Sequence, residues 1–264
     1  MKLFNSAHID VPAGLVRRGA GLKTISLTVR YGLIDLKGGG LCLVDTGVGP
    51  EVTQGQRSAA LRLYGSILRP KLDPDQSPRA MLRGLGATAE DVRSVVLTHF
   101  HADHISSLGD FSRAEIIACG EAARRVTSMR SGAALRHGIF KELIPQGIER
   151  RLRPLQRMTR VATGTVLGDG YDLFADGSYL AVPLPGHAFG HFGIFWRDQA
   201  GPIVYATDAS WTLEALLRDQ TPAISSAVVF DDRQAGRQTQ QRLREFAREG
   251  GRILLCHDVE DQRS

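Results

Sequence analysis

Three histidines and one aspartate occur within six residues, in the run His99-Phe100-His101-Ala102-Asp103-His104. The run directly follows the apolar stretch 94–98, which we expect to be a strand that delivers it to the edge of a sheet. The His-x-His spacing lets two imidazoles approach one cation, while Asp103 and His104 turn towards a second. Because the chain of 264 residues has only eight histidines, chance clustering explains the run poorly. The sequence therefore predicts a metal site at the end of this strand.

Three further metal-binding side chains follow apolar segments later in the chain. His187 lies in the stretch 183–191, where proline and glycine bend the backbone so that an imidazole can be presented at a strand end. Asp208 and His257 each come directly after a short apolar, strand-like run. With the first run, they make five histidines and two aspartates, which is enough for two metal ions.

Five segments in a fixed order carry a family resemblance. They are Leu43-Val44-Asp45-Thr46-Gly47, the run from His99 to His104, Pro185-Gly186-His187, Thr207-Asp208 and Cys256-His257-Asp258. In this pattern the chain resembles the metallo-β-lactamase-fold superfamily of hydrolases, and within it the dinuclear branch that includes N-acyl homoserine lactonases. The resemblance covers nearly the whole chain. It implies an α+β fold, an αββα sandwich of two mixed sheets with helices on both outer faces.

The resemblance also implies how the ligands are shared. The first metal would be held by His99, His101 and His187, the second by Asp103, His104 and His257, and Asp208 would bridge both. Asp103 and Asp208 would be the catalytic carboxylates, beside a metal-bridging hydroxide that attacks an ester-type carbonyl. Two divalent ions are implied; the imidazole-rich set favours zinc, while the carboxylates also suit iron or manganese.

Three other residues are candidates for supporting roles. Asp45 ends the apolar run 41–44 and can accept a hydrogen bond from a ligating imidazole, with a plain turn residue as the alternative. Lactonases of this group resemble one another in a tyrosine three positions after the bridging aspartate, where this chain has Trp211. An indole can donate one N–H but cannot transfer a phenolic proton. Trp211 and Phe100 are expected to line the substrate pocket, with core packing as the alternative for Trp211.

A locally basic segment lies between the two halves of the ligand pattern. Residues 121–160 contain nine arginines and one lysine against three glutamates, whereas the whole chain carries a net charge of +5. We expect a helical, lid-like insertion around 121–165, in which Arg124 and Arg125 face the substrate pocket and attract an anionic substrate or acyl carrier. A solvated helix face is the alternative. Nucleic acid is disfavoured as a partner, because aromatic residues are not interleaved with the basic ones.

The remaining features bound the class of protein. A single domain over 1–264 is expected, since cutting the chain would split the ligands; a homodimer is left open. No apolar run approaches the roughly 20 residues that span a bilayer, and residues 1–10 do not resemble a secretory signal, so a cytoplasmic location without membrane association is expected.

Cys256 is expected to face the core, because the side chains of neighbouring residues on a strand point to opposite faces. The other histidines, His8, His137 and His191, are expected to lie on the surface or in packing contacts.

Hydrophobic patterns and turn residues predict the main elements. Strands are expected at 22–30, 40–45, 112–118, 179–196, 203–207 and 252–256, and helices at 78–85, from 121 onwards and at 238–250.

The leading hypothesis for function is a small-molecule hydrolase that opens a lactone such as an N-acyl homoserine lactone, a quorum-quenching reaction. An acyl-thioester hydrolase, favoured by the basic segment, and an aryl- or phosphoester hydrolase are the enzymatic alternatives. The non-enzymatic alternative is a metal-binding regulator with vestigial activity.

Overall fold

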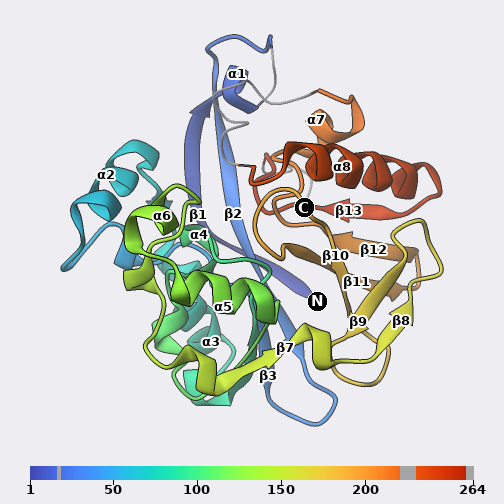
Figure 1. Ribbon diagram of the computed structural model, residues 1–264, viewed down its shortest axis with the longest axis horizontal. Helices are drawn as coiled ribbons and strands as arrows, with labels where there is room; N and C mark the ends of the chain where they lie inside the picture. Colours follow the sequence, from blue (N-terminus) through green and yellow to red (C-terminus); the bar gives the residue numbers. More distant parts are fainter. Residues whose placement is uncertain (17–18, 221–229, 260–264) are drawn as a thin grey trace. The chain divides into compact units, whose positions relative to one another are not determined.

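The computed structural model describes residues 1–16, 19–220 and 230–259, and these form two compact units. Unit 1 comprises Met1–Asp10 and Ser26–Arg153; unit 2 comprises Val11–Ile25 and Pro154–Ser264. The main β-sheet of each unit is visible in Figure 1. In the described part of the chain, no helix is both long enough and apolar enough to cross a membrane.

The sheet of unit 1 has seven strands in the order β4-β1-β2-β3-β5-β6-β7. Strand β3 pairs in parallel with β5 and β5 with β6, whereas the β1–β4 and β2–β3 pairs are antiparallel, so the sheet is mixed. The strands are β1 Lys2–Pro12, β2 Thr24–Asp35, β3 Leu41–Val44, β4 Lys71–Leu72, β5 Val92–Val96, β6 Glu115–Ala118 and β7 Leu152–Pro154.

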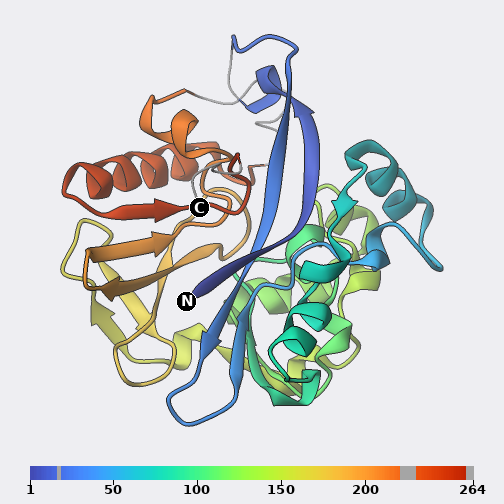
Figure 2. The ribbon, with the colours of Figure 1, turned by 180° about the vertical axis from the view of Figure 1, so that it is seen from behind.

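Helices connect the parallel strands of unit 1, as parallel pairing requires. The α-helices are α2 Ala59–Leu68, α3 Pro78–Gly84, α4 Ala102–Ile105, α5 Gly120–Ser128 and α6 Ser131–Leu135, and Figure 2 shows them from behind. Local sequence explains where α3 begins: Ser77 caps it by accepting a hydrogen bond from Ala80 N, and Pro78 occupies the first turn. Met81 and Leu82 then bury the inner face of the helix.

The sheet of unit 2 has six strands in the order β13-β12-β11-β10-β9-β8. Neighbouring strands pair antiparallel except β12 and β13, which are parallel, so this sheet is mixed too. The strands are β8 Arg160–Ala162, β9 Asp169–Asp172, β10 Leu180–Pro183, β11 Phe192–Asp198, β12 Gly201–Tyr205 and β13 Arg252–Leu254. The unit also contains the short helices α1 Ala13–Val16 and α7 Leu213–Leu217.

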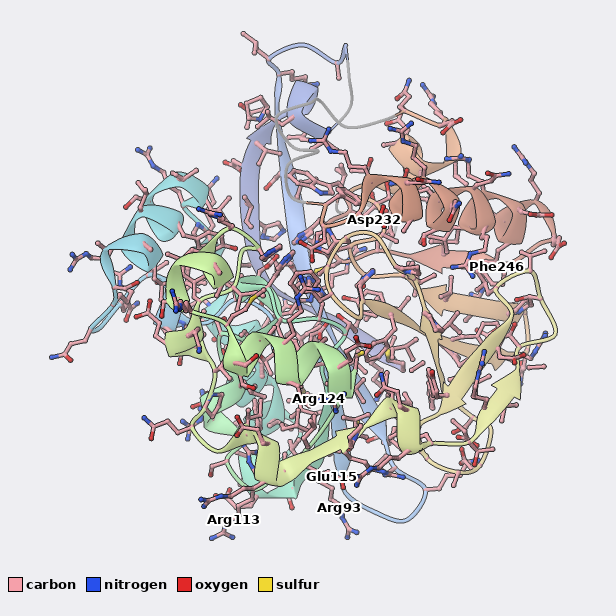
Figure 3. All side chains as sticks on the ribbon, in the orientation of Figure 1. Arg93, Arg113, Glu115, Arg124, Asp232 and Phe246 are labelled. Carbon is pink, nitrogen blue, oxygen red and sulfur yellow. The ribbon has the colours of Figure 1, made fainter. Side chains whose placement is uncertain are left out.

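Helix α8, Arg233–Arg248, lies in the connection from β12 to β13. Asp232 caps its start by accepting hydrogen bonds from Gln234 N and Ala235 N. Leu243 and Phe246 are buried along one face and join the core of the unit. Figure 3 marks Asp232 at the start of the helix and Phe246 near its end.

Most of the expected elements are present, with three corrections. The strand expected at 179–196 is two strands, β10 and β11, because Pro185 and Gly186 break the run between them. Helix α8 begins five residues earlier than its expected start at 238, at its Asp232 cap. The segment 121–165 is not helical throughout: after the short helices and turns up to 151, the chain enters strands β7 and β8.

Candidate metal centre

The first group of predicted ligands lies in unit 1, just after β5. His99 and His101 are in the loop beyond the strand, and Asp103 and His104 are in the first turn of α4; all four are buried. The imidazole centroid of His99 lies 4.6 Å from that of His101 and 4.0 Å from that of His104. Asp103 Oδ2 lies 3.7 Å from His104 Nε2. The end of one strand therefore brings three imidazoles and a carboxylate together.

Asp45 fixes the orientation of His104. Its carboxylate, fully buried, accepts hydrogen bonds from Thr98 N at 2.9 Å, from Thr98 Oγ1 at 2.7 Å and from His104 Nδ1 at 2.8 Å. A carboxylate can only accept, so Nδ1 carries the proton and the Nε2 lone pair is left for a ligand. Thr46 also holds this segment, since its N and Oγ1 donate to the carbonyl oxygen of His104 at 2.8 and 2.9 Å.

The second group of predicted ligands lies in unit 2. Asp208 Oδ2 is 3.3 Å from Nε2 of His187 and 3.3 Å from Nε2 of His257, and all three residues are buried. Donor atoms around a tetrahedral zinc, with bonds of about 2.0–2.1 Å, are about 3.3 Å apart. The spacing and the donor types in this group therefore fit shared metal ions.

Glycine is required in the turn that presents His187. Gly186 has φ +129°, and a Cβ there would lie 2.3 Å from both Cα and N of Gly236 at the start of α8. Backbone atoms cannot move aside cheaply, so a side chain at this position displaces either the turn or the helix.

Cys256 is fully buried, as expected of a core residue, but the direction of its side chain differs from the expectation. Ligand atoms of Asp208, Cys256 and His257 lie within 4.8 Å of one another, so the thiol does not face away from the predicted ligands. The reason is that β13 ends at Leu254 and residues 256–257 form a bend, in which side chains no longer alternate.

The residues predicted to line a pocket differ in exposure. Phe100 is buried, Trp211 is half-buried, and Arg124 and Arg125 are on the exposed side of α5, opposite its buried alanines. Figure 3 labels Arg124 on this helix. Their roles toward a substrate stay predictions.

Several other arginines of the basic segment make structural contacts. Arg151 donates to the carbonyl oxygens of Phe111 and Ala114 at 2.8 and 2.7 Å. Arg153 pairs with Glu115 of β6 at 3.5 Å, and Figure 3 labels Glu115. The excess of positive charge in this segment is therefore partly explained by the fold.

Of the two positions expected for His191, the structure shows the packing position, and sequence reasoning missed only its hydrogen bonds. It is buried, at 2% exposure, and hydrogen-bonds through both ring nitrogens to Leu184 O and Thr207 Oγ1. A surface position is therefore excluded. Its position four residues after His187, in the same proline- and glycine-rich turn, was the available signal.

Comparisons with known proteins agree with this arrangement. The sequence model of the Metallo-beta-lactamase superfamily matches residues 27–257, a range that contains all seven predicted ligands. N-acyl homoserine lactonase AttM of Azorhizobium caulinodans is 26% identical over 227 residues, which are 83% of this chain and 78% of that protein.

Two solved structures show the same fold. A quorum-quenching N-acyl homoserine lactone lactonase has a TM-score of 0.72 at 20% identity, over 99% of this chain and 92% of that chain. AidC, a dizinc quorum-quenching lactonase in complex with a product, has a TM-score of 0.65 at 16% identity, over 97% and 86% of the two chains. The expected α+β class with two mixed sheets, and the expected class of metallo-hydrolase, are confirmed. The chain belongs to the metallo-β-lactamase superfamily.

Proposed function

We propose that this protein is a dinuclear metallo-hydrolase that opens lactone rings, with N-acyl homoserine lactones as its substrate class. One observation carries the proposal: a single carboxylate oxygen, Asp208 Oδ2, lies 3.3 Å from Nε2 of both His187 and His257. A ligand that bridges two cations must face the ligands of each, and this oxygen faces one imidazole assigned to each ion.

The two groups of ligands together form the proposed centre. Family membership supports this assembly, and the predicted ligands within each unit lie close to one another. The first ion is assigned to His99, His101 and His187, the second to Asp103, His104 and His257, and Asp208 bridges them. Zinc is the proposed metal, because five of the seven ligands are imidazoles.

The chemistry divides between the metals and the chain. When bound, divalent ions act as Lewis acids and lower the pKa of a coordinated water to about 7. Asp103 and Asp208 supply two negative charges among the imidazoles, so the centre keeps a net positive charge that can polarise a carbonyl. In the reaction the oxygen of one water bonds to the carbonyl carbon, the ring C–O bond breaks, and the departing alkoxide takes a proton to give a hydroxy acid.

The choice of a lactone over a thioester rests on relatives. AttM and the solved structures are named as homoserine lactone lactonases. Trp211, three residues after Asp208, is proposed to direct its indole N–H to the substrate carbonyl. Trp211→Phe, which removes the N–H but keeps an aromatic ring, should lower kcat more than it raises KM; unchanged kcat would make Trp211 a wall of the pocket.

The deciding experiment compares initial hydrolysis rates of zinc-loaded protein on a long-chain acyl homoserine lactone and on an acyl-coenzyme A thioester. His101→Ala should abolish turnover, while His8→Ala, a histidine outside the ligand pattern, should leave it unchanged. Faster lactone opening supports the proposal. Faster thioester cleavage would overturn the substrate, and metal binding without any turnover would favour a regulator.

The basic face of α5 provides a second test of substrate charge. Replacing Arg124 and Arg125 with serine should raise KM for anionic substrates more than for neutral ones, if these exposed side chains attract the substrate. An equal effect on both classes would leave them as a solvated helix face.

A further inference from the structure

His191 bonds two chain segments of unit 2 to each other. Its Nδ1 lies 2.7 Å from the carbonyl oxygen of Leu184, and its Nε2 lies 2.6 Å from Thr207 Oγ1. A carbonyl can only accept, so Nδ1 donates, and in the neutral ring Nε2 accepts the hydroxyl proton of Thr207. Because both nitrogens are used in this way, His191 is not placed to act as a metal ligand itself.

Thr207 extends this connection to a third segment. Its carbonyl oxygen accepts a hydrogen bond from Cys256 N at 3.0 Å, and it is fully buried with φ +46°. A β-branched residue with positive φ is a backbone outlier that persists only where its surroundings hold it. The hydroxyl bond to His191 and the carbonyl bond to Cys256 are two such restraints.

The bonded residues adjoin the proposed ligands. Thr207 precedes Asp208, and Cys256 precedes His257. Leu184 begins the turn that presents His187, and Leu184 N donates to the carbonyl oxygen of His191 at 3.1 Å. The His191 ring also lies edge-on to the ring of His187, with centroids 5.5 Å apart. One chain of hydrogen bonds therefore runs through all three segments that carry a ligand in unit 2.

We propose that His191 and Thr207 act as a pair of positioning residues that hold His187, Asp208 and His257 at metal-binding distance. This inference rests on the proposed metal centre and adds to it two residues that do not touch the metals. Without the Thr207 hydroxyl bond, the strained turn before Asp208 loses its side-chain restraint, and the 3.3 Å spacing of Asp208 to both imidazoles is no longer enforced.

The test uses two substitutions of Thr207 that differ in the hydroxyl. Thr207→Val keeps the β-branched shape and removes the hydroxyl, whereas Thr207→Ser keeps the hydroxyl. Zinc affinity is measured by competition with a chromophoric chelator, and ligand geometry by the visible absorption of the cobalt-substituted protein. Thr207→Val should lower metal affinity about 10- to 100-fold and alter the cobalt spectrum, and Thr207→Ser should restore both towards wild type.

A double-mutant cycle tests whether the two residues act together. His191→Phe should also weaken metal binding, and the double variant with Thr207→Val should bind little worse than either single variant, because the same bond is lost in each. If Thr207→Val does not fold, His191→Gln replaces it, since the glutamine amide can donate to Leu184 O or accept from Thr207 but cannot span both as the ring does.

The outcomes separate this inference from the proposed function. Variants that keep wild-type zinc affinity and cobalt spectrum, while their metal-free forms unfold at lower urea concentration, would reduce the pair to core packing and overturn the inference. Wild-type protein that binds no metal would instead refute the proposed centre.

Discussion

Asp45→Asn tests the arrangement in unit 1, because it keeps the size of a buried side chain and removes its charge. The carboxylate of Asp45 accepts from Thr98 N, Thr98 Oγ1 and His104 Nδ1 at 2.9, 2.7 and 2.8 Å. Asparagine has one acceptor oxygen. If this oxygen stays with Thr98 N, the amide NH₂ faces His104 Nδ1. His104 must then carry its proton on Nε2, which removes the lone pair that a metal needs.

The loss can be estimated from the bonds. One hydrogen bond to a charged group contributes about 1.5–3 kcal/mol to the free energy of unfolding. For a chain of this size, a loss of about 2 kcal/mol lowers Tm by about 4–8 °C. Zinc affinity should fall about 10- to 100-fold as the imidazole changes tautomer.

Urea unfolding of the metal-free protein measures the first effect, and chelator competition the second. Asp35→Asn is the matched control: the residue is exposed at the end of β2, and its substitution should change stability by less than about 0.5 kcal/mol. An Asp45→Asn protein with the unfolding midpoint and the zinc affinity of wild type would refute the reasoning.

Three other changes have distinct expected outcomes. Asp208→Ala should reduce bound metal below two ions per chain by elemental analysis, and retention of both would contradict bridging. Gly186 and Gly201 both have strongly positive φ, +129° and +121°, but of the two only Gly186 would place a Cβ 2.3 Å from backbone atoms. Gly186→Ala should therefore lower Tm far more than Gly201→Ala, and equal shifts in Tm would argue against the clash. Burial raises the pKa of Glu51 above its ordinary 4.5, so its protonated form favours folding. That contribution to the free energy of unfolding is full below pH 4.5 and is lost as the pH rises through the pKa of Glu51 in the folded protein. Glutamine does not ionise, so in Glu51→Gln the urea unfolding midpoint should fall less over this pH range than in the wild type.

Much of the fold could be predicted from sequence because its signals are local. The apolar run before His99 is strand β5, and the glycine pair that follows α8 precedes β13, as expected. Strand β1, Lys2–Pro12, was missed although Ala7, Ile9 and Val11 alternate with polar residues, because the first half of the strand does not alternate. The later part of the basic segment was expected to be helical, but it contains β7, which pairs with β6 earlier in the chain, and β8, a three-residue strand that pairs with β9 in a local hairpin.

In the candidate site too, local features could be predicted from the sequence, whereas contacts between distant residues could not. The candidate ligands were chosen from residue type and order, since histidine and aspartate after strands are informative by themselves. The contacts that orient them do not: the His191–Thr207 bond joins residues 16 apart, and the Asp45–His104 bond joins residues 59 apart. Cys256 is buried as expected, but the direction of its thiol was wrong because the rule of alternation was applied two residues beyond the end of its strand.

In both units, a buried residue with positive φ lies near the candidate ligands and is bonded to a histidine ring. Asp45, φ +60°, follows β3, and Thr207, φ +46°, follows β12; each is fully buried and bonded to a histidine ring, His104 or His191. Such strain costs about 1–3 kcal/mol per residue, so in each case it persists because hydrogen bonds hold it.

Glycine at either position adopts positive φ without this strain. In Thr207→Gly, relief of strain should therefore offset part of the lost hydrogen bond in the free energy of unfolding, whereas nothing offsets the loss of a defined turn before Asp208. Zinc affinity should fall much further than stability does. If urea unfolding and chelator competition instead gave parallel losses, the strained turn would serve the fold of unit 2 rather than the position of its ligands.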